Sequence, residues 1–166
     1  MVNVGITGHQ NLGTADTAHW VVLAIKKVVT EIAITQGFTS LAIGTDQLFA
    51  NIMVEKAIPF IVVVPCTKIE LSFKSDKDTA LFRQLLAQAK GILRLPFDEP
   101  SEEAYFEAGK TVVDKSDLLI AVWDGQPAKG LGGTGDVVHY ALKNKKEVIH
   151  VDLEARKVNQ IHSPEQ

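Results

Sequence analysis

The residues best suited to chemistry lie in a glycine-rich segment between an apolar stretch and an amphipathic one. Residues 118–123 are apolar, Asp124 and Gly125 follow, and Gly130-Leu-Gly-Gly-Thr-Gly135 leads into the apolar residues of 137–142. Glycine lets the backbone approach a ligand closely, and the N–H groups that begin a helix favour phosphate or another anion. The pattern predicts an anion site with these candidates: Gly125, Gly130, Gly132, Gly133, Thr134 and Gly135.

Two other segments carry small and polar residues of the same kind. Gly5-Ile-Thr-Gly-His9 and Gly44-Thr-Asp-Gln47 each belong to the end of a short apolar stretch. In an open α/β sheet, the loops at such strand ends form the ligand crevice. We therefore expect these residues to contact the ligand: Thr7, Gly8, His9, Gln10, Gly44, Thr45, Asp46 and Gln47.

Asp46 and Asp124 each have two interpretations. As ligand groups, their carboxylates would accept hydrogen bonds from a sugar hydroxyl or a base amine. Asp46 also suits the positively polarised first turn of a helix, and Asp124 also suits a turn after a strand. The spacing of Gly5, Gly8 and Gly13 differs from the G-x-G-x-x-G dinucleotide fingerprint.

The composition indicates one acidic domain. The chain has 166 residues, 46% of them hydrophobic, and a formal net charge of −3. These values suit a single core and predict no attraction for nucleic acid or acidic membranes. Cys66 is the sole cysteine, so no internal disulfide forms and a reducing, cytoplasmic compartment is expected. No residue cluster has metal-ligand spacing, and no apolar run is long enough to span a bilayer.

The apolar periodicity predicts alternating strands and helices. The expected strands are residues 2–7, 41–43, 60–64, 92–95, 118–123 and 148–151. The expected helices are residues 15–36, 45–57, 79–90, 101–115 and 134–144, with Thr45 and Thr134 as N-caps. This alternation is typical of a single-domain, doubly wound, Rossmann-like α/β fold, with a mostly parallel sheet of about six strands and helices on both faces.

The domain is expected to span residues 1–153, with residues 154–166 as a polar tail. Ligands of such sheets bind where the strand order reverses. The strands that end at Thr7 and Trp123 should therefore lie side by side.

The motifs resemble those of the SLOG superfamily of Rossmann-like nucleotide-binding domains, which includes YpsA-like, DprA-like and LOG-related proteins. The resemblance rests on Gly5-Ile-Thr-Gly-His9, Gly44-Thr-Asp46, residues 113–125 and Gly132-Gly-Thr134, and it spans residues 2–151. It implies a nucleotide-derived small ligand at the glycine loop and assembly into dimers or larger homo-oligomers.

Two enzyme groups of similar sequence bear on catalysis. LOG phosphoribohydrolases carry P-G-G-x-G-T-x-x-E, but here Asp136 replaces the threonine and His139 replaces the catalytic glutamate. In an overlay on the G-T-x-x-E segment of nucleoside 2-deoxyribosyltransferases, Val137 replaces the nucleophilic glutamate. A valine can neither attack a sugar carbon nor transfer a proton. The remaining candidates for a catalytic carboxylate are Asp136, Asp124 and Asp46.

The leading hypothesis is a sensor or carrier domain that binds a phosphorylated nucleoside without efficient catalysis, with phosphate on the amides of residues 132–135. The alternative is an enzyme that cleaves an N-glycosidic bond. A third hypothesis is a structural module without a ligand. Apart from the nucleotide, no cofactor is identified. A homo-oligomer is expected, and no metal, nucleic-acid or membrane partner is expected.

Overall fold

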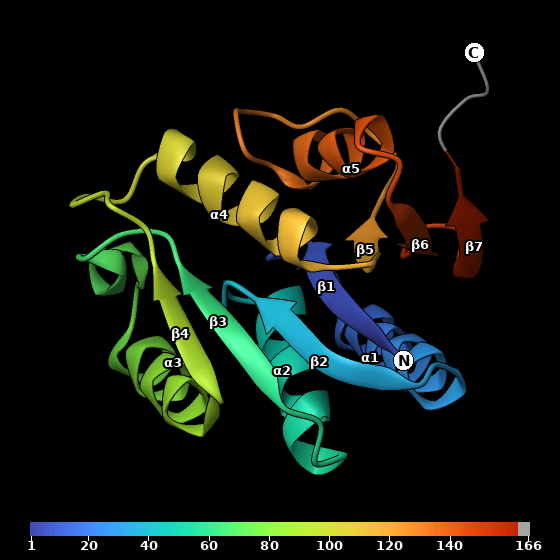
Figure 1. Ribbon diagram of the computed structural model, residues 1–166, viewed down its shortest axis with the longest axis horizontal. Helices are drawn as coiled ribbons and strands as arrows, with labels where there is room; N and C mark the ends of the chain where they lie inside the picture. The colour runs from blue at the N-terminus through green and yellow to red at the C-terminus, as the bar shows by residue number, and fades with distance from the viewer. Residues whose placement is uncertain (163–166) are drawn as a thin grey trace.

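The computed structural model describes residues 1–162, which form one seven-stranded sheet with helices on both faces (Figure 1). The strands are β1 (Val2–Gly8), β2 (Ile34–Thr39), β3 (Phe60–Val64), β4 (Gly91–Arg94), β5 (Leu118–Trp123), β6 (Glu147–Asp152) and β7 (Lys157–Ile161). The helices are α1 (Ala15–Glu31), α2 (Thr45–Glu55), α3 (Asp76–Gln88), α4 (Glu102–Lys115) and α5 (Thr134–Lys143), with a 3-10 turn, η1 (Ile69–Ser72). This is the doubly wound α/β fold that the sequence predicts.

The strand order reverses next to β1. The order in the sheet is β4-β3-β2-β1-β5-β6-β7, and every pairing is parallel except that of β6 with β7. Thr7 pairs with Ala121 and Gly8 pairs with Val122, so the carboxyl ends of β1 and β5 lie side by side as predicted. A reversal of this kind opens a crevice at that edge of the sheet.

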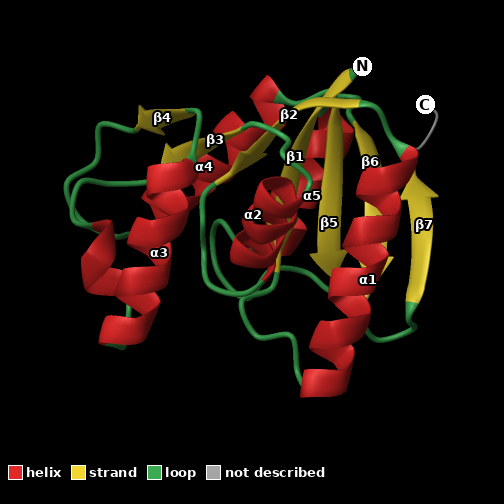
Figure 2. Cartoon of the chain, turned by 90° about the horizontal axis from the view of Figure 1, so that it is seen from below, coloured by secondary structure: helices red, strands yellow, loops and turns green. Residues whose placement is uncertain are grey.

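Two apolar layers hold the helices on the sheet. Helices α1, α2 and α3 cover one face, as Figure 2 shows, and bury Ile25 and Phe49 against it. Helices α4 and α5 cover the other face and bury Val113 and Val137. Strand β5 lies between the two layers and is buried along almost its whole length, which explains its continuous apolar sequence.

The second strand lies earlier in the chain than the sequence predicts. Periodicity favours a helix through residue 36 and a strand at residues 41–43, whereas α1 ends at Glu31 and β2 spans Ile34–Thr39. β2 pairs with β1 on one side and with β3 on the other. This pairing outweighs the local apolar pattern, because tertiary context overrides propensity. Residues 40–44 consequently form a loop at the carboxyl end of β2.

The predicted polar tail contains a strand. Residues 157–161 form β7, which pairs with β6 from Val148 to Asp152. Most of β7 is exposed, and an exposed edge strand is typically polar, so its composition resembles that of a tail. Residues 163–166 of the expected tail lie outside the described residues.

Candidate functional site

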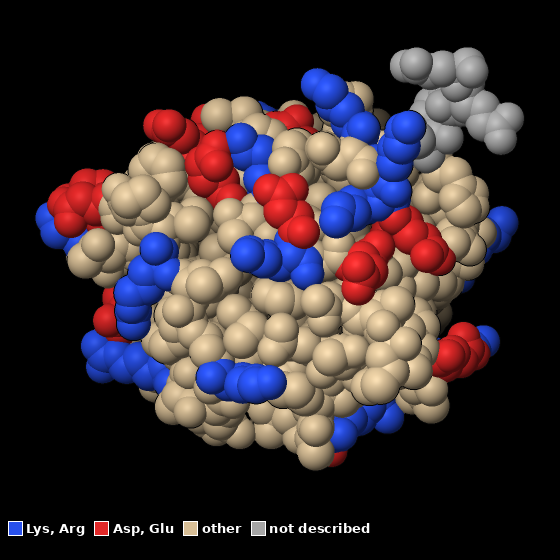
Figure 3. All heavy atoms as spheres, in the orientation of Figure 1, with Lys and Arg blue, Asp and Glu red and all other residues tan. Residues whose placement is uncertain are grey.

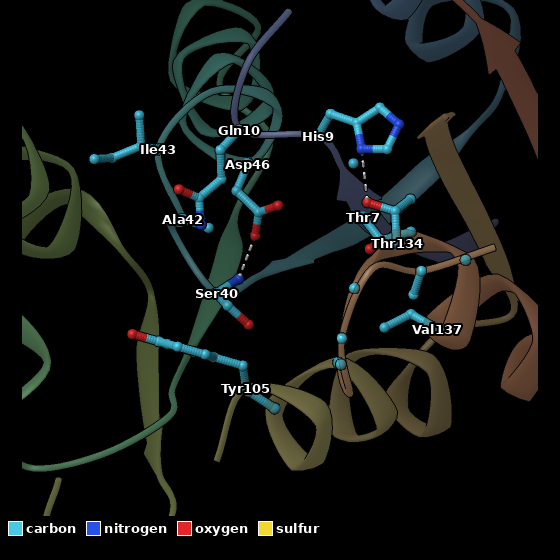
Figure 4. A pocket seen from close by; sticks show the side chains of 18 of the residues that line it. Thr7, His9, Gln10, Ser40, Ala42, Ile43, Asp46, Tyr105, Thr134 and Val137 are labelled. Carbon is cyan, nitrogen blue, oxygen red and sulfur yellow. Dashed lines mark hydrogen bonds between the residues drawn. The ribbon is translucent and has the colours of Figure 1, made fainter. Parts of the chain in front are cut away.

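A cleft of about 1040 Å³ opens at the carboxyl ends of β1, β2 and β5. Its walls are the loop after β2, the end of β1 and the glycine loop of residues 126–135 that leads into α5. Figure 4 shows Ser40 and Asp46 on one side, Thr134 on the other, and Tyr105 of α4 along a third. Small-molecule sites typically have volumes of about 300–1,000 Å³, so the cleft has room for a nucleotide-sized ligand.

Asp46 and Gln47 hold the loop after β2 in shape. Oδ2 of Asp46 accepts hydrogen bonds from Thr39 Oγ1 and Ser40 N, both at 2.9 Å. Nε2 of Gln47 donates to Leu41 O at 3.2 Å. Burial raises the pKa of Asp46 to about 6, although these hydrogen bonds oppose the shift. The Asp46 carboxylate therefore accepts hydrogen bonds from Thr39 and Ser40 of the same chain. Its position in the sequence does not predict these contacts.

Gly44 fixes the place where this loop meets the end of β1. Its φ is +86°, and a Cβ there would overlap the carbonyl oxygen of Gln10. Thr45 Oγ1 donates to His9 O at 2.9 Å. Thr45 is therefore not the predicted N-cap of α2. Gly44 occupies that position, because the Thr45 hydroxyl is bonded to the β1 end.

His9 connects β1, β5 and α5 through both of its ring nitrogens. Nε2 accepts a hydrogen bond from the Asp124 backbone N–H at 3.3 Å and also lies 3.3 Å from Asp124 Oδ1. Nδ1 lies 3.5 Å from Thr134 Oγ1, and this contact is dashed in Figure 4. A hydrogen bond from Gln126 N, and then the contact with His9, lower the pKa of Asp124. The Asp124 carboxylate is therefore ionised at neutral pH.

The glycine loop leaves two amide donors free at the start of α5. Gly132 N donates to Asp136 Oδ2 at 3.1 Å, and Gly133 N donates within the loop at 3.4 Å. In residues 1–162, no protein group accepts a hydrogen bond from Thr134 N or Gly135 N. Of the four amides predicted to hold phosphate, two are thus occupied by the protein and two are available.

The loop is also packed against the start of α4. Gly132 has φ +86°, and a Cβ there would lie 2.9 Å from Glu102 O and 2.9 Å from Phe106 N. Gly133 is the N-cap of α5 and Thr134 is its first helical residue. The prediction of Thr134 as the N-cap is therefore wrong by one position, and its hydroxyl does not cap the helix.

Most of the predicted ligand residues border the cleft. Those that do are Thr7, Gly8, His9, Gln10, Asp46, Asp124, Gly130, Gly132, Gly133, Thr134 and Gly135. Those that do not are Gly44, Thr45, Gln47 and Gly125. The sequence analysis missed Ser40, Ile43, Phe73 and Tyr105, which also border it. Their types and spacing do not distinguish cleft residues from packing residues.

The three candidate catalytic carboxylates differ in their surroundings. Asp136 is bonded to Gly132 N and does not border the cleft. Asp46 is bonded to the loop after β2, and Asp124 borders the cleft beside His9. Of the three, only Asp124 lies next to a histidine side chain, that of His9.

Metal-binding clusters and membrane-spanning helices are both absent from residues 1–162. No group of three or more histidine, cysteine, aspartate or glutamate residues in that range could hold a metal ion. No helix there combines the length and the apolar character that crossing a membrane requires.

The fold and the position of the cleft together define a Rossmann-like α/β domain. No protein-family model matches the sequence, and no curated protein matches it as a relative.

Several solved structures share the fold. DNA processing protein A from Helicobacter pylori, whose single-stranded DNA binding mode has been described, matches with a TM-score of 0.65 and 20% identity over 90% of this chain and 64% of its own. DNA processing protein A from Streptococcus pneumoniae matches with a TM-score of 0.64 and 16% identity over 89% of this chain and 49% of its own. The molybdenum cofactor carrier protein of Chlamydomonas reinhardtii matches with a TM-score of 0.55 and 15% identity over 89% and 74%.

These likenesses confirm the predicted Rossmann-like α/β fold. The chain spans less than two thirds of the length of either DNA processing protein.

One expectation drawn from the net charge is wrong. The value of −3 predicted no nucleic-acid partner, yet the Helicobacter pylori protein of the same fold binds single-stranded DNA. A net charge averages over the whole surface, and Figure 3 shows basic and acidic side chains side by side on one face. The net charge of this chain therefore excludes no nucleic-acid partner.

Proposed function

We propose that the cleft binds a phosphorylated nucleoside or a related small ligand, and that the domain acts as a sensor or carrier of that ligand. The observation that carries the proposal is the pair of free N–H groups on Thr134 and Gly135, both of which border the cleft. Free amides at a helix N-terminus can donate hydrogen bonds to a bound anion, and the helix dipole favours negative charge at that position.

The phosphate end of the cleft has further support. Lys129 borders the cleft on the same loop and carries a positive charge. Asp136 is negative and lies in the first turn of α5, but its carboxylate accepts from Gly132 N and so is turned toward the loop. The site therefore favours a phosphate with few charges, such as a monophosphate, over a strongly charged polyphosphate.

The opposite end suits a base and a sugar. Ile43, Phe73 and Tyr105 border the cleft there and supply apolar and aromatic surface. Ser40, which Figure 4 shows between Asp46 and Tyr105, also borders the cleft and offers a hydroxyl to a polar edge. Aromatic rings bind flat, partly polar groups with little loss of conformational freedom. A nucleoside monophosphate that spans the cleft would place its phosphate at the amides and its base and sugar at the aromatic end.

The substitution Thr134→Pro tests the amide directly. Proline has no N–H and is favoured at the first position of a helix, and Gly133 has the extended ψ of 171° that a following proline requires. Thr134→Ala is the matched control, because it also removes the hydroxyl but keeps the amide. Binding of AMP and of adenosine would be measured by calorimetry for all three proteins.

AMP should bind Thr134→Pro at least about tenfold more weakly than Thr134→Ala, since a hydrogen bond to a charged group contributes roughly 1.5–3 kcal/mol. Adenosine, which lacks the phosphate, should bind the two variants equally. Equal AMP binding by Thr134→Pro and Thr134→Ala would contradict the assignment of this amide to phosphate.

Single-stranded nucleic acid is a second candidate ligand, favoured by the fold shared with the Helicobacter pylori DNA-binding protein. Fluorescence anisotropy with a labelled oligothymidylate, repeated at increasing salt, detects such binding, because phosphate contacts weaken steeply with salt. Competition by AMP would place the strand in the same cleft. Binding that AMP does not displace would place it elsewhere.

The N-glycosidic alternative has less support. Its reaction needs a carboxylate at the sugar, and among the candidates only Asp124 borders the cleft without being bonded to the loop after β2. Chromatography of AMP and deoxynucleosides after incubation with the protein tests it, with free base as the product to detect.

A further inference from the structure

The protein holds the Asp46 carboxylate in place through only one of its two oxygens. Oδ2 accepts the hydrogen bonds from Thr39 Oγ1 and Ser40 N, and within residues 1–162 no hydrogen bond reaches Oδ1. No buried side-chain oxygen in that range lacks a hydrogen-bond partner, so Oδ1 must be accessible from outside the protein. Asp46 is only 6% exposed and borders the cleft. Its free oxygen is therefore open to a molecule bound in the cleft.

Asp46 lies between the two ends of that cleft. In Figure 4 its side chain stands between Ile43, at the apolar end, and Thr134, whose backbone N–H is free. A nucleotide has its sugar between the base and the phosphate, so the sugar of a ligand that spans the cleft would lie beside Asp46. Building on the proposed function, we propose that Asp46 Oδ1 accepts hydrogen bonds from the ribose hydroxyls, and that the cleft selects nucleotides with a free 2′,3′-diol.

The chemistry of a carboxylate suits this role. An ionised carboxyl group only accepts hydrogen bonds, and each sugar hydroxyl has one proton to donate. Hydrogen bonds to an ionised group are roughly twice as strong as neutral ones, and a buried site of low dielectric strengthens them further. The contacts of Oδ2 already hold the Asp46 side chain, so little conformational freedom is lost when a sugar binds.

Within residues 1–162, Asp46 has no cationic partner that would compete with the sugar. None of the ion pairs in that range includes it. Burial raises the pKa of Asp46 to about 6, and the Ser40 amide, the Thr39 hydroxyl and the nearby Ala42 amide oppose that shift. A hydroxyl that donates to the carboxylate favours its ionised form. The preference for a ribose diol should therefore grow as the pH rises through about 6.

A comparison of AMP with 2′,3′-dideoxy-AMP tests the sugar hydroxyls alone. The two nucleotides carry the same base and the same phosphate, so the titration of the phosphate cancels in the ratio of their dissociation constants. Calorimetry at pH 5 and pH 7.5 measures this ratio for the wild type and for Asp46→Asn. An asparagine keeps an oxygen for Thr39 Oγ1 and Ser40 N and presents an uncharged amide to the cleft.

The wild type should bind AMP at least about tenfold more tightly than 2′,3′-dideoxy-AMP at pH 7.5, as a hydrogen bond to a charged group requires. This preference should fall several-fold at pH 5, where Asp46 is mostly protonated. In Asp46→Asn the preference should be small and the same at both pH values, because the asparagine does not titrate.

Asp98→Asn is the matched control. Asp98 is an exposed carboxylate that pairs with Lys68 outside the cleft, so this variant should keep the wild-type preference and its pH dependence. A preference that Asp46→Asn leaves unchanged overturns the proposal. A wild-type preference that is absent, or equal at both pH values, overturns it without any variant, while nucleotide binding still stands. If neither nucleotide binds, the proposed function fails as well, and the two failures are therefore distinguishable.

Discussion

Two carboxylates at the same edge of the sheet have pKa values shifted in opposite directions. Burial raises the pKa of Asp46 to about 6, whereas hydrogen bonds from Gln126 N and from His9 lower the pKa of Asp124. The sequence places both residues at strand ends but does not show where they point. That direction depends on loops whose shape is set by contacts far along the chain, such as the one between Asp124 and His9.

The buried Asp46 gives the first prediction, which concerns the free energy of unfolding. The difference in this free energy between the wild type and an Asp46→Asn variant should change with pH. The pKa of Asp46 rises from an ordinary value of 3.8 to about 6 in the folded protein, so the folded state binds the proton more tightly than the unfolded state does. This contribution to stability is fully present below pH 3.8 and is lost as the pH rises through 6. A gap of this size corresponds to a free energy on the order of 3 kcal/mol.

Asp46→Asn should remove that pH dependence. An asparagine oxygen can still accept from Ser40 N and Thr39 Oγ1 without carrying a charge. Urea unfolding at pH 4.5, 6 and 7.5 should therefore show the variant gaining stability relative to the wild type as the pH rises. A difference between the two proteins that stays constant over this range would contradict the assignment of the shift to Asp46.

At the scale of elements, the sequence predicts best where one local signal dominates. β5 is an apolar run that ends at Asp124, and its predicted bounds match the structure. α4 begins where Ser101 caps it. β2 contains Gln36, Gly37 and two threonines, and it is a strand because it pairs on both sides with β1 and β3. No local pattern contains that information. Because the sequence predicts this strand at residues 41–43, it does not predict that residues 40–44 form the loop at one wall of the cleft.

The junction between that loop and β1 gives the second prediction. Gly44 and Gly13 both have positive φ, at +86° and +80°, but a Cβ on Gly44 would overlap the Gln10 backbone, whereas a Cβ on Gly13 would meet nothing within 4 Å. Gly13→Ala should therefore lose only the roughly 1–2 kcal/mol of a left-handed residue. Gly44→Ala should lose about 1–3 kcal/mol more, as overpacked sites do.

Urea unfolding of both variants measures the two free energies, and AMP calorimetry reports whether the cleft survives. Binding should weaken more in Gly44→Ala than in Gly13→Ala: Gly13 borders the cleft, but its added Cβ meets nothing within 4 Å and does not displace the loop. Equal losses of stability in the two alanine variants would mean that the cost comes from the positive φ alone. The close approach of Gly44 to the Gln10 backbone would then contribute nothing.

At the scale of the whole molecule, the two halves of the sheet meet at β1 and β5, and the predicted doubly wound architecture follows from that junction. The alternation of strands and helices is enough to predict it, because parallel strands need crossover connections. The ends of the sheet are less predictable. β7 is mostly exposed, so it buries little of the apolar surface on which sequence patterns depend.

The edge strand gives the last prediction. β7 pairs with β6 from Val148 to Asp152, and a chain that ends at Arg156 would leave this row of backbone groups unpaired. An unpaired edge is a template for association with another chain. The truncated chain should therefore form larger species as its concentration rises, measured by light scattering beside the full chain. Its melting temperature should fall by only a few degrees, because β7 contributes little to the core.

Val158→Lys in the full chain is the control for this truncation. Val158 is an exposed apolar residue of β7, so the substitution changes the surface while the backbone pairing with β6 is kept. It should leave the size of the particles as in the unmodified chain. A truncated chain that scatters light like the full chain at every concentration would mean that β6 is protected by something other than β7.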